Sequence, residues 1–175
     1  WQELFVDAVR RDPPERYGMW IVPSLNPDGY AAYSRLNANS VDLNADGGRF
    51  SQPESQALHR LVSRVRPALT VHLHSPNGFA GAHPNGAVRA TGVCWSIAAH
   101  TSIRCAGGGA GYRADRSRWF LWQGLQPLGG ESLLVELFAV SDAEVPTARP
   151  RPATRSVAEV RRHVAVILRS LDDAF

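Results

Sequence analysis

Leu69-Thr-Val-His-Leu-His74, followed by Ser75-Pro-Asn-Gly78, is the stretch on which the fold assignment depends. Its apolar residues alternate with Thr70, His72 and His74, and an alternation of period two is typical of a β-strand. The pattern predicts a strand over residues 69–74 that points two imidazoles to the same side. Proline, asparagine and glycine directly after His74 predict a loop at the end of that strand.

Helical patterns flank this strand in the sequence. Residues 2–11 place apolar side chains at helical spacing, and residues 91–104 are also expected to be helical. Ser51-Gln-Pro-Glu54 has the form of a capping box and predicts a helix that ends before Pro67. A second capping box, Ser156-x-x-Glu159, predicts a C-terminal helix that packs back onto the body.

Two further apolar runs are short enough to be strands. One is Met19–Val22, which precedes a proline, and the other is Leu133–Phe138. Strands that alternate with helices predict an α/β domain, with a mixed, largely parallel sheet and helices on both faces. A chain of 175 residues is predicted to form one domain, residues 1–175.

The composition excludes several classes of protein. With 44% hydrophobic and 20% charged residues, the chain is predicted to fold as a globule, not as a disordered tail or a coiled coil. No apolar run approaches the roughly 20 residues that span a bilayer, so we expect no membrane span. All 19 positive charges are arginines scattered along the chain, and this scatter does not predict binding to nucleic acid.

The chain contains two cysteines, Cys94 and Cys105. They could form one disulfide that closes a short loop, but two cysteines do not make a disulfide framework. We expect them to be buried as small apolar residues, and the pair leaves the cellular compartment open.

Three polar features are expected where strands end. In doubly wound sheets, ligand sites lie at the carboxyl ends of strands, and the loop at Asn26-Pro-Asp-Gly29, His74 and Glu136 are the candidates. Glu136 lies within an apolar run, so we expect it to face a cleft or to be neutralised by a partner. Arg35 lies in a polar loop, where a guanidinium could hold an oxyanion or a substrate carboxylate.

Several of these motifs occur in one order that resembles a known family. Asn26-Pro-Asp-Gly29, Arg35-x-Asn-Ala-Asn-x-Val-Asp-Leu-Asn44, Gln52-Pro-Glu-Ser55, His74-Ser75 and Glu136 resemble the zinc metallocarboxypeptidase family. Within it, the chain is most similar to the branch of small bacterial murein-peptide amidases. The resemblance covers most of residues 1–140.

The resemblance implies a role for five residues. His74 would be the third zinc ligand, and Glu136 would be the general base that shuttles a proton to the leaving amine. Arg35 would be the electrophilic clamp on the scissile carbonyl, and Asn44 would hold the terminal carboxylate of the substrate. Tyr112 lies roughly where the family has a mobile tyrosine.

The chain departs from the family pattern at two places. The first two zinc ligands of the family come from a His-x-x-Glu motif, which by the family pattern would lie a few residues before Trp1. We therefore expect a chain severed just downstream of that motif, whose sheet lacks its N-terminal strands. Ala45 stands where the family has an arginine that grips a C-terminal carboxylate, and Arg49 is a candidate replacement.

Three hypotheses about function follow. The first is a zinc-dependent hydrolase of peptide bonds, a carboxypeptidase or a peptide amidase, whose peptide substrate has a cell-wall character by analogy with the amidase branch. The second is a catalytically inactive relative that binds peptides without metal. The third is an acylase of the related deacylase group, against which the loop at residues 26–29 argues. Compartment and oligomeric state stay open.

Overall fold

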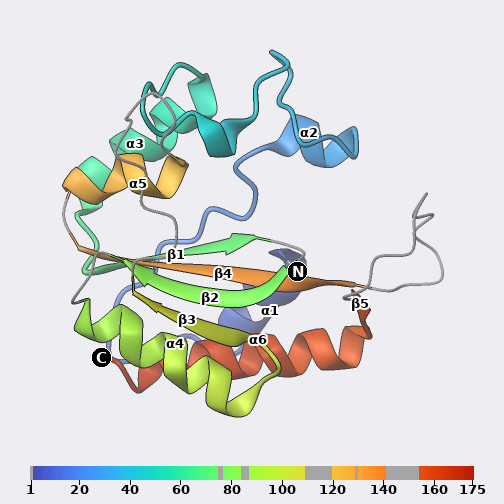
Figure 1. The fold of residues 1–175 in the computed structure, drawn as a ribbon, viewed down its shortest axis with the longest axis vertical. Coiled ribbons are helices and arrows are strands. Elements are labelled where there is room, and N and C mark those ends of the chain that lie inside the picture. Colours follow the sequence, from blue (N-terminus) through green and yellow to red (C-terminus); the bar gives the residue numbers. More distant parts are fainter. Residues whose placement is uncertain (1, 75–76, 84–86, 109–119, 129, 141–153) are drawn as a thin grey trace.

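The computed structural model describes residues 2–74, 77–83, 87–108, 120–128, 130–140 and 154–175. One five-stranded sheet runs through the middle of the molecule (Figure 1). Its strands follow the order β1-β4-β2-β3, and the short strand β5 lies beside β4. The strands are β1 Leu69–His74, β2 Asn77–His83, β3 Arg104–Gly108, β4 Glu131–Val140 and β5 Thr154–Arg155.

The sheet is mixed, as the sequence predicts. Strand β4 runs parallel to β1 and to β5 and antiparallel to β2, and β2 runs parallel to β3. The strand predicted over residues 69–74 is therefore β1, at one edge of the sheet. The predicted strand at 133–138 is the middle part of β4, which contacts more strands than any other in the described sheet.

Helices lie on both sides of the sheet (Figure 1). Helices α1, α4 and α6 gather on one side, where α6 contacts both α1 and α4. Helices α2, α3 and α5 lie on the other side, together with a short 3₁₀ turn, η1. The helices are α1 Gln2–Arg11, α2 Pro27–Ala31, α3 Pro53–Val65, α4 Val88–His100, α5 Leu121–Leu125 and α6 Val157–Asp172, and the 3₁₀ turns are η1 Leu43–Ala45 and η3 Gln126–Leu128.

The hydrophobic core lies between β4 and the layer of α4 and α6. Leu133, Val135 and Leu137 are almost fully buried and belong to the same apolar cluster as Ile97 of α4 and Ile167 of α6. Burial of each such side chain stabilises the fold by about 1.5–3 kcal/mol. Because side chains alternate along a strand, residues 132, 134 and 136 point to the opposite side, which turns Glu136 away from this core.

Two local expectations about secondary structure differ from the structure. Residues 19–22 form no strand, and Trp20, Ile21 and Val22 are exposed, because no neighbouring strand takes up their backbone groups. Helix α4 ends at His100 and β3 starts at Arg104, so the helix predicted over 91–104 is displaced toward the N-terminus.

The predicted capping box at Ser51 also differs. Helix α3 begins after Gln52, which makes no side-chain cap bond, because Ser51 donates its hydrogen bonds to Asp46 instead. The capping box of α6 is present as predicted, with Ser156 and Glu159 bonded reciprocally.

Cys94 and Cys105 form a disulfide, which corrects the expectation of two separate buried thiols. The bond joins α4 to β3, and the two Cα atoms lie 5.4 Å apart, within the usual range for disulfides. Helix α4 and strand β3 follow each other closely in the chain and pack together, which brings the two sulfurs into contact. Of the helices that the structure describes, none has the length and apolar character to cross a membrane.

Candidate active site

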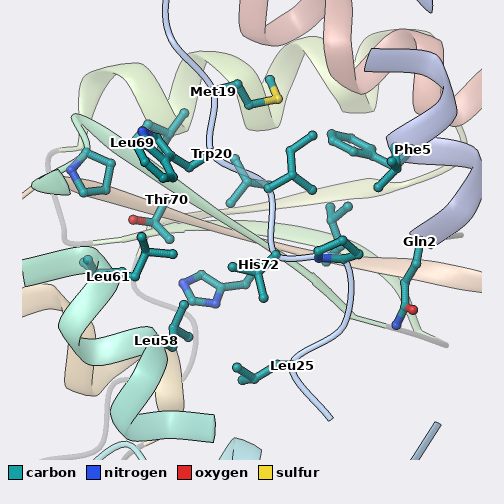
Figure 2. A pocket seen from close by; sticks show the side chains of 18 of the residues that line it. Gln2, Phe5, Met19, Trp20, Leu25, Leu58, Leu61, Leu69, Thr70 and His72 are labelled. Carbon is teal, nitrogen blue, oxygen red and sulfur yellow. The ribbon is translucent and has the colours of Figure 1, made fainter. Parts of the chain in front are cut away.

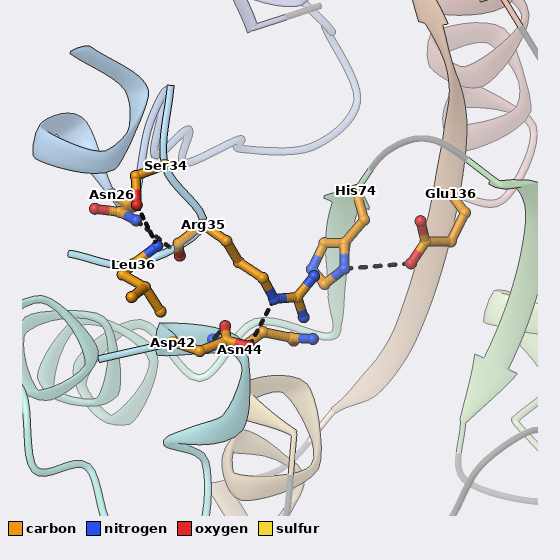
Figure 3. Close-up of polar contacts among 8 residues, drawn as sticks. All are labelled: Asn26, Ser34, Arg35, Leu36, Asp42, Asn44, His74 and Glu136. Atoms are coloured by element: carbon orange, nitrogen blue, oxygen red, sulfur yellow. Dashed lines mark hydrogen bonds and ion pairs between the residues drawn. The ribbon is translucent and has the colours of Figure 1, made fainter. Parts of the chain in front are cut away.

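His74 and Glu136 lie at matching positions on neighbouring strands. In the parallel pairing of β1 with β4, their Cα atoms are register partners, so both side chains point to the same face of the sheet. Nδ1 of His74 lies 3.4 Å from Oε1 of Glu136 (Figure 3). His74 is the last residue of β1, as predicted for a site at a strand end, whereas Glu136 lies in the middle of β4.

Glu136 is a charged residue that is nevertheless buried, with 9% of its surface exposed. Its neighbours along the strand, Val135 and Leu137, are buried on the opposite face. The sequence led us to expect that this carboxylate faces a cleft or has a partner, and the structure places the His74 imidazole beside it. A carboxylate beside an imidazole, with little access to water, can accept and return a proton during a reaction.

Arg35 is paired with Asp42 across the loop that carries both. Nε of Arg35 donates to Oδ2 of Asp42 at 2.6 Å, and the arginine side chain is 70% exposed. Within the described part of the chain, the terminal guanidinium nitrogens have no hydrogen-bond partner. Figure 3 shows the side chain extending in the direction of His74. The guanidinium can therefore offer its outer edge to an anion on the His74 side of the sheet.

Asn26 connects the first motif to Arg35. Its Oδ1 accepts from the backbone of Gly29 and caps α2, while its Nδ2 donates to the carbonyl of Arg35 at 3.3 Å. A Cβ atom at position 29 would overlap the Asn26 side chain and come within 2.7 Å of the Leu36 carbonyl. The Asn-Pro-Asp-Gly sequence thus requires glycine because the Arg35 loop packs directly against it.

Asn44 belongs to the turn η1 and lies beside Asp42. Its backbone N donates to Oδ1 of Asp42 at 3.0 Å, so one carboxylate holds both Arg35 and the start of η1. The side-chain Oδ1 of Asn44 is buried and, among the described residues, has no hydrogen-bond partner. Buried polar atoms without partners are rare, so this oxygen is an unsatisfied acceptor within the described part of the chain. Figure 3 draws Asn44 on the same side as Arg35 and His74.

Asp46 is buried directly behind this loop. Its carboxylate accepts from the backbone and hydroxyl of Ser51, from the backbone of Gln52 and from the hydroxyl of Ser55. Burial by itself would raise the pKa of Asp46, but these hydrogen bonds outweigh it and lower the pKa below its ordinary value. Asp46 therefore fastens the loop to the first turn of α3.

An apolar groove adjoins the site along β1 (Figure 2). It has a volume of about 920 Å³ and lies between α1, the segment 17–25, α3 and β1. His72 projects into it, and His74 is also among the residues that line it. His72 therefore shares a face with His74, as the alternation predicts, but its surroundings are apolar residues such as Leu58 and Leu61.

The described residues do not by themselves fit a catalytic zinc ion. Such a site needs three protein ligands and an open position, whereas the donors here are one imidazole and the carboxylate of Glu136. Across the described ranges, no cluster of three His, Cys, Asp or Glu side chains could hold a metal. We therefore assign no reaction step to a metal.

The predicted site residues are brought together in part. Arg35, Asn44, His74 and Glu136 come from three separate segments and lie on one side of the sheet (Figure 3). Tyr112 lies outside the described residues. Ala45 is exposed and apolar, so it offers no charge to a substrate.

Sequence reasoning missed two residues that hold this arrangement. Asp42 pairs with Arg35, and Asn37 closes the loop between them. Both lie within the motif of residues 35–44, so their signal was the density of Asn and Asp around one arginine. Such side chains often bond to nearby backbone and fix loops.

No protein-family model matches the chain. Two curated proteins resemble part of its sequence. Carboxypeptidase SOL1 of Arabidopsis thaliana is 34% identical over 83 residues, which covers 39% of this chain. A probable periplasmic serine endoprotease DegP-like of Halomonas elongata is 35% identical over 78 residues, which covers 42% of this chain. The chain spans only 17% and 16% of the length of these relatives.

Two solved structures share the fold. Murein-tripeptide amidase MpaA from Escherichia coli O157 matches 86% of this chain and 66% of its own, with a TM-score of 0.58 and 19% identity. A metallocarboxypeptidase from Burkholderia cenocepacia matches 88% of this chain and 43% of its own, with a TM-score of 0.61 and 17% identity.

These likenesses confirm the predicted fold class. The chain has a zinc carboxypeptidase-like fold, and the resemblance drawn from the motifs is supported by the two structures and by the carboxypeptidase match. The two curated relatives are named as different kinds of protease, so the partial sequence matches do not select a mechanism by themselves.

Proposed function

We propose that this chain, with its zinc carboxypeptidase-like fold, hydrolyses peptide or amide bonds. The observation that carries the proposal is the pair formed by His74 and the buried Glu136, at matching register on β1 and β4 and on the side of the sheet toward which Arg35 extends. The fold neighbours named as an amidase and a metallocarboxypeptidase support the reaction class.

Glu136 is the proposed general base. Its carboxylate takes a proton from the attacking water as the oxygen bonds to the scissile carbonyl carbon. It then gives that proton to the nitrogen as the carbon–nitrogen bond breaks, so the leaving group departs as a neutral amine. Its burial and the adjacent His74 fit this role, because a base shielded from bulk water keeps its proton for the leaving group.

Arg35 is the proposed clamp for the developing negative charge. The outer edge of its guanidinium stabilises the tetrahedral oxyanion, while Nε donates a hydrogen bond to Asp42. Asn44 is the proposed substrate ligand on the resemblance, because its side-chain amide can donate hydrogen bonds to an oxygen of the substrate. Tyr112 is proposed as a further substrate contact on the resemblance alone.

Zinc is part of the proposal as the metal that His74 helps to bind. On the resemblance, His74 is proposed to be one zinc ligand of three. The other two are expected from outside the residues whose side chains the structure describes.

The proposed substrate is a peptide that need not end in a free carboxylate. Ala45 gives no cation at the position where the resembled family has an arginine. An amide or a cell-wall peptide fits an uncharged residue at this position at least as well as a free C-terminus.

A catalytically inactive peptide-binding protein is the alternative function. It is favoured by one observation, that the uncharged Ala45 stands where the resembled family has an arginine that grips the substrate. In that case Arg35 and Asn44 would bind a peptide that is never cleaved.

Zinc content and hydrolysis together test the proposal. Elemental analysis would be made on this chain and on any longer form that its gene encodes, and both would be assayed with matched peptides carrying a free or an amidated C-terminus. We expect stoichiometric zinc and cleavage of both peptides by the metal-loaded protein. If every form binds the peptides but contains no zinc and cleaves neither peptide, the protein is the peptide-binding relative instead.

A further inference from the structure

One buried side chain, Asn37, closes the loop that carries Arg35. Only 6% of Asn37 is exposed. Its Oδ1 accepts from the backbone N of Asn39 at 3.0 Å and of Val41 at 2.9 Å. Its backbone N also donates to the carbonyl of Val41 at 2.9 Å. The chain is thereby folded into a tight turn between residues 37 and 41.

The other end of the same side chain fixes this turn to α3. Nδ2 of Asn37 donates to Oε1 of Gln52 at 3.1 Å and lies 3.2 and 3.3 Å from the two carboxylate oxygens of Glu54. Gln52 and Glu54 stand at the start of α3, which Asp46 fastens from the opposite side. The turn therefore rests on a helix end that is itself held by several hydrogen bonds.

Arg35 and Asp42 lie at the two ends of this turn. Leu36 and Asp42 form an isolated antiparallel bridge, which places Asp42 across from Leu36 and within reach of the neighbouring Arg35 side chain. Arg35 is largely exposed, so its direction depends on the single bond to Asp42 rather than on packing. A contact that keeps this turn closed therefore also fixes the position of the Arg35 guanidinium.

We propose that Asn37 is a positioning residue, which directs the Arg35 guanidinium by keeping Asp42 opposite it. The catalytic consequence rests on the proposed function, whereas the positioning itself can be measured without any reaction.

The chemistry of Asn37 matches this role. Asparagine offers an acceptor and two donors on a short side chain, and both ends are used here. Aspartate has the same shape but would place a carboxylate oxygen against the carboxylate of Glu54 and against Oε1 of Gln52. That repulsion would push the turn away from α3 without creating a cavity.

Three substitutions test the positioning. Asn37→Asp is the disruptive variant, and Asn37→Ser, which keeps an acceptor and loses the donors, serves if the first does not fold. Asn39→Ala is the matched control: Asn39 is exposed, belongs to the same turn and donates from its side chain to the same Gln52 oxygen. Its backbone N–H, which Asn37 holds, is retained in the variant.

The first readout is hydrogen exchange at Nε of Arg35, measured by NMR. The bond to Asp42 should slow this exchange, and we expect it to accelerate at least tenfold in Asn37→Asp and to stay within twofold of wild type in Asn39→Ala. Equal exchange in the wild type and in both Asn37 variants would overturn the proposal, whatever the activity.

The second readout is a double-mutant cycle with Arg35→Ala in the hydrolysis assay. Misplacement of a reacting group by about 1 Å can lower a rate about 100-fold. We expect Asn37→Asp to lower kcat about 10- to 100-fold with little change in KM, and to have no further effect when Arg35 is absent. An equal loss in both backgrounds would mean a purely structural role. A zinc-loaded wild-type protein that cleaves nothing would refute the proposed function, while the exchange measurement would still decide the role of Asn37.

Discussion

Asp46 shows how one residue determines both a helix start and the position of a loop. Four hydrogen bonds from Ser51, Gln52 and Ser55 converge on its buried carboxylate. Burial acts to raise the pKa of Asp46, and the hydrogen bonds lower it further than burial raises it. The ionised form is therefore the one that stabilises the folded state.

Asp46→Asn is predicted to destabilise the protein by about 1–3 kcal/mol, because an amide would turn donors toward groups that already donate. The pKa of Asp46 in the folded state lies below its value of about 3.9 in the unfolded state. The extra stability of the wild type over the variant is therefore complete at a pH above about 3.9, and it disappears as the pH falls through the folded-state pKa. Urea unfolding of both proteins between pH 7 and pH 2 measures this. Asp12→Asn, at an exposed position, is the control; a difference that does not change with pH would contradict the prediction.

At the scale of elements, two glycines in helices are predicted to respond in opposite ways. Gly29 of α2 touches Asn26 and the Leu36 carbonyl, so Gly29→Ala would force the Arg35 loop away at about 1–3 kcal/mol. Gly92 of α4 is exposed, with open space where a Cβ would lie, so Gly92→Ala would stabilise by about 0.5–1 kcal/mol. Thermal unfolding of the two variants compares them directly, and a Gly29→Ala protein as stable as wild type would contradict the packing described.

Elements with a strong local signal were predicted from the sequence. The alternation of residues 69–74 predicted β1. The motif Ser156-x-x-Glu159 predicted the capping box of α6, and the structure contains its reciprocal hydrogen bonds. Residues 19–22 were predicted wrongly, because a short apolar run becomes a strand only when another strand lies beside it. The start of α3 was predicted one residue early for a related reason, since Asp46 competes for the Ser51 hydroxyl.

The whole molecule depends on contacts between segments that are distant in the sequence. Glu136 is paired with His74 only because β1 lies beside β4, and an order of β1-β4-β2-β3 cannot be read from local patterns. The family resemblance, not periodicity, predicted that Arg35, Asn44, His74 and Glu136 act together. The partner of Arg35 was missed because its pairing depends on a turn closed by Asn37.

The Cys94–Cys105 disulfide is a further contact at this scale. It joins α4 to β3 across a separation of 11 residues, and a loop of that length predicts a contribution of about 3 kcal/mol to stability. We expect a reducing agent to lower the Tm of the wild type and to leave that of a Cys94→Ala, Cys105→Ala double variant unchanged. Two alkylatable thiols in the native protein before reduction would contradict the bond.

Glu136→Gln tests whether Glu136 is the general base of peptide hydrolysis. The amide keeps the shape of the side chain but cannot take a proton from water, so kcat in the zinc-loaded protein should fall by about 10²- to 10⁴-fold. Glu131→Gln is the matched control, because Glu131 lies on the same strand and its acceptor role toward the backbone of Ala90 survives in the amide. We predict that Glu131→Gln retains wild-type hydrolysis and that Glu136→Gln loses it; equal hydrolysis by the two variants would contradict the account.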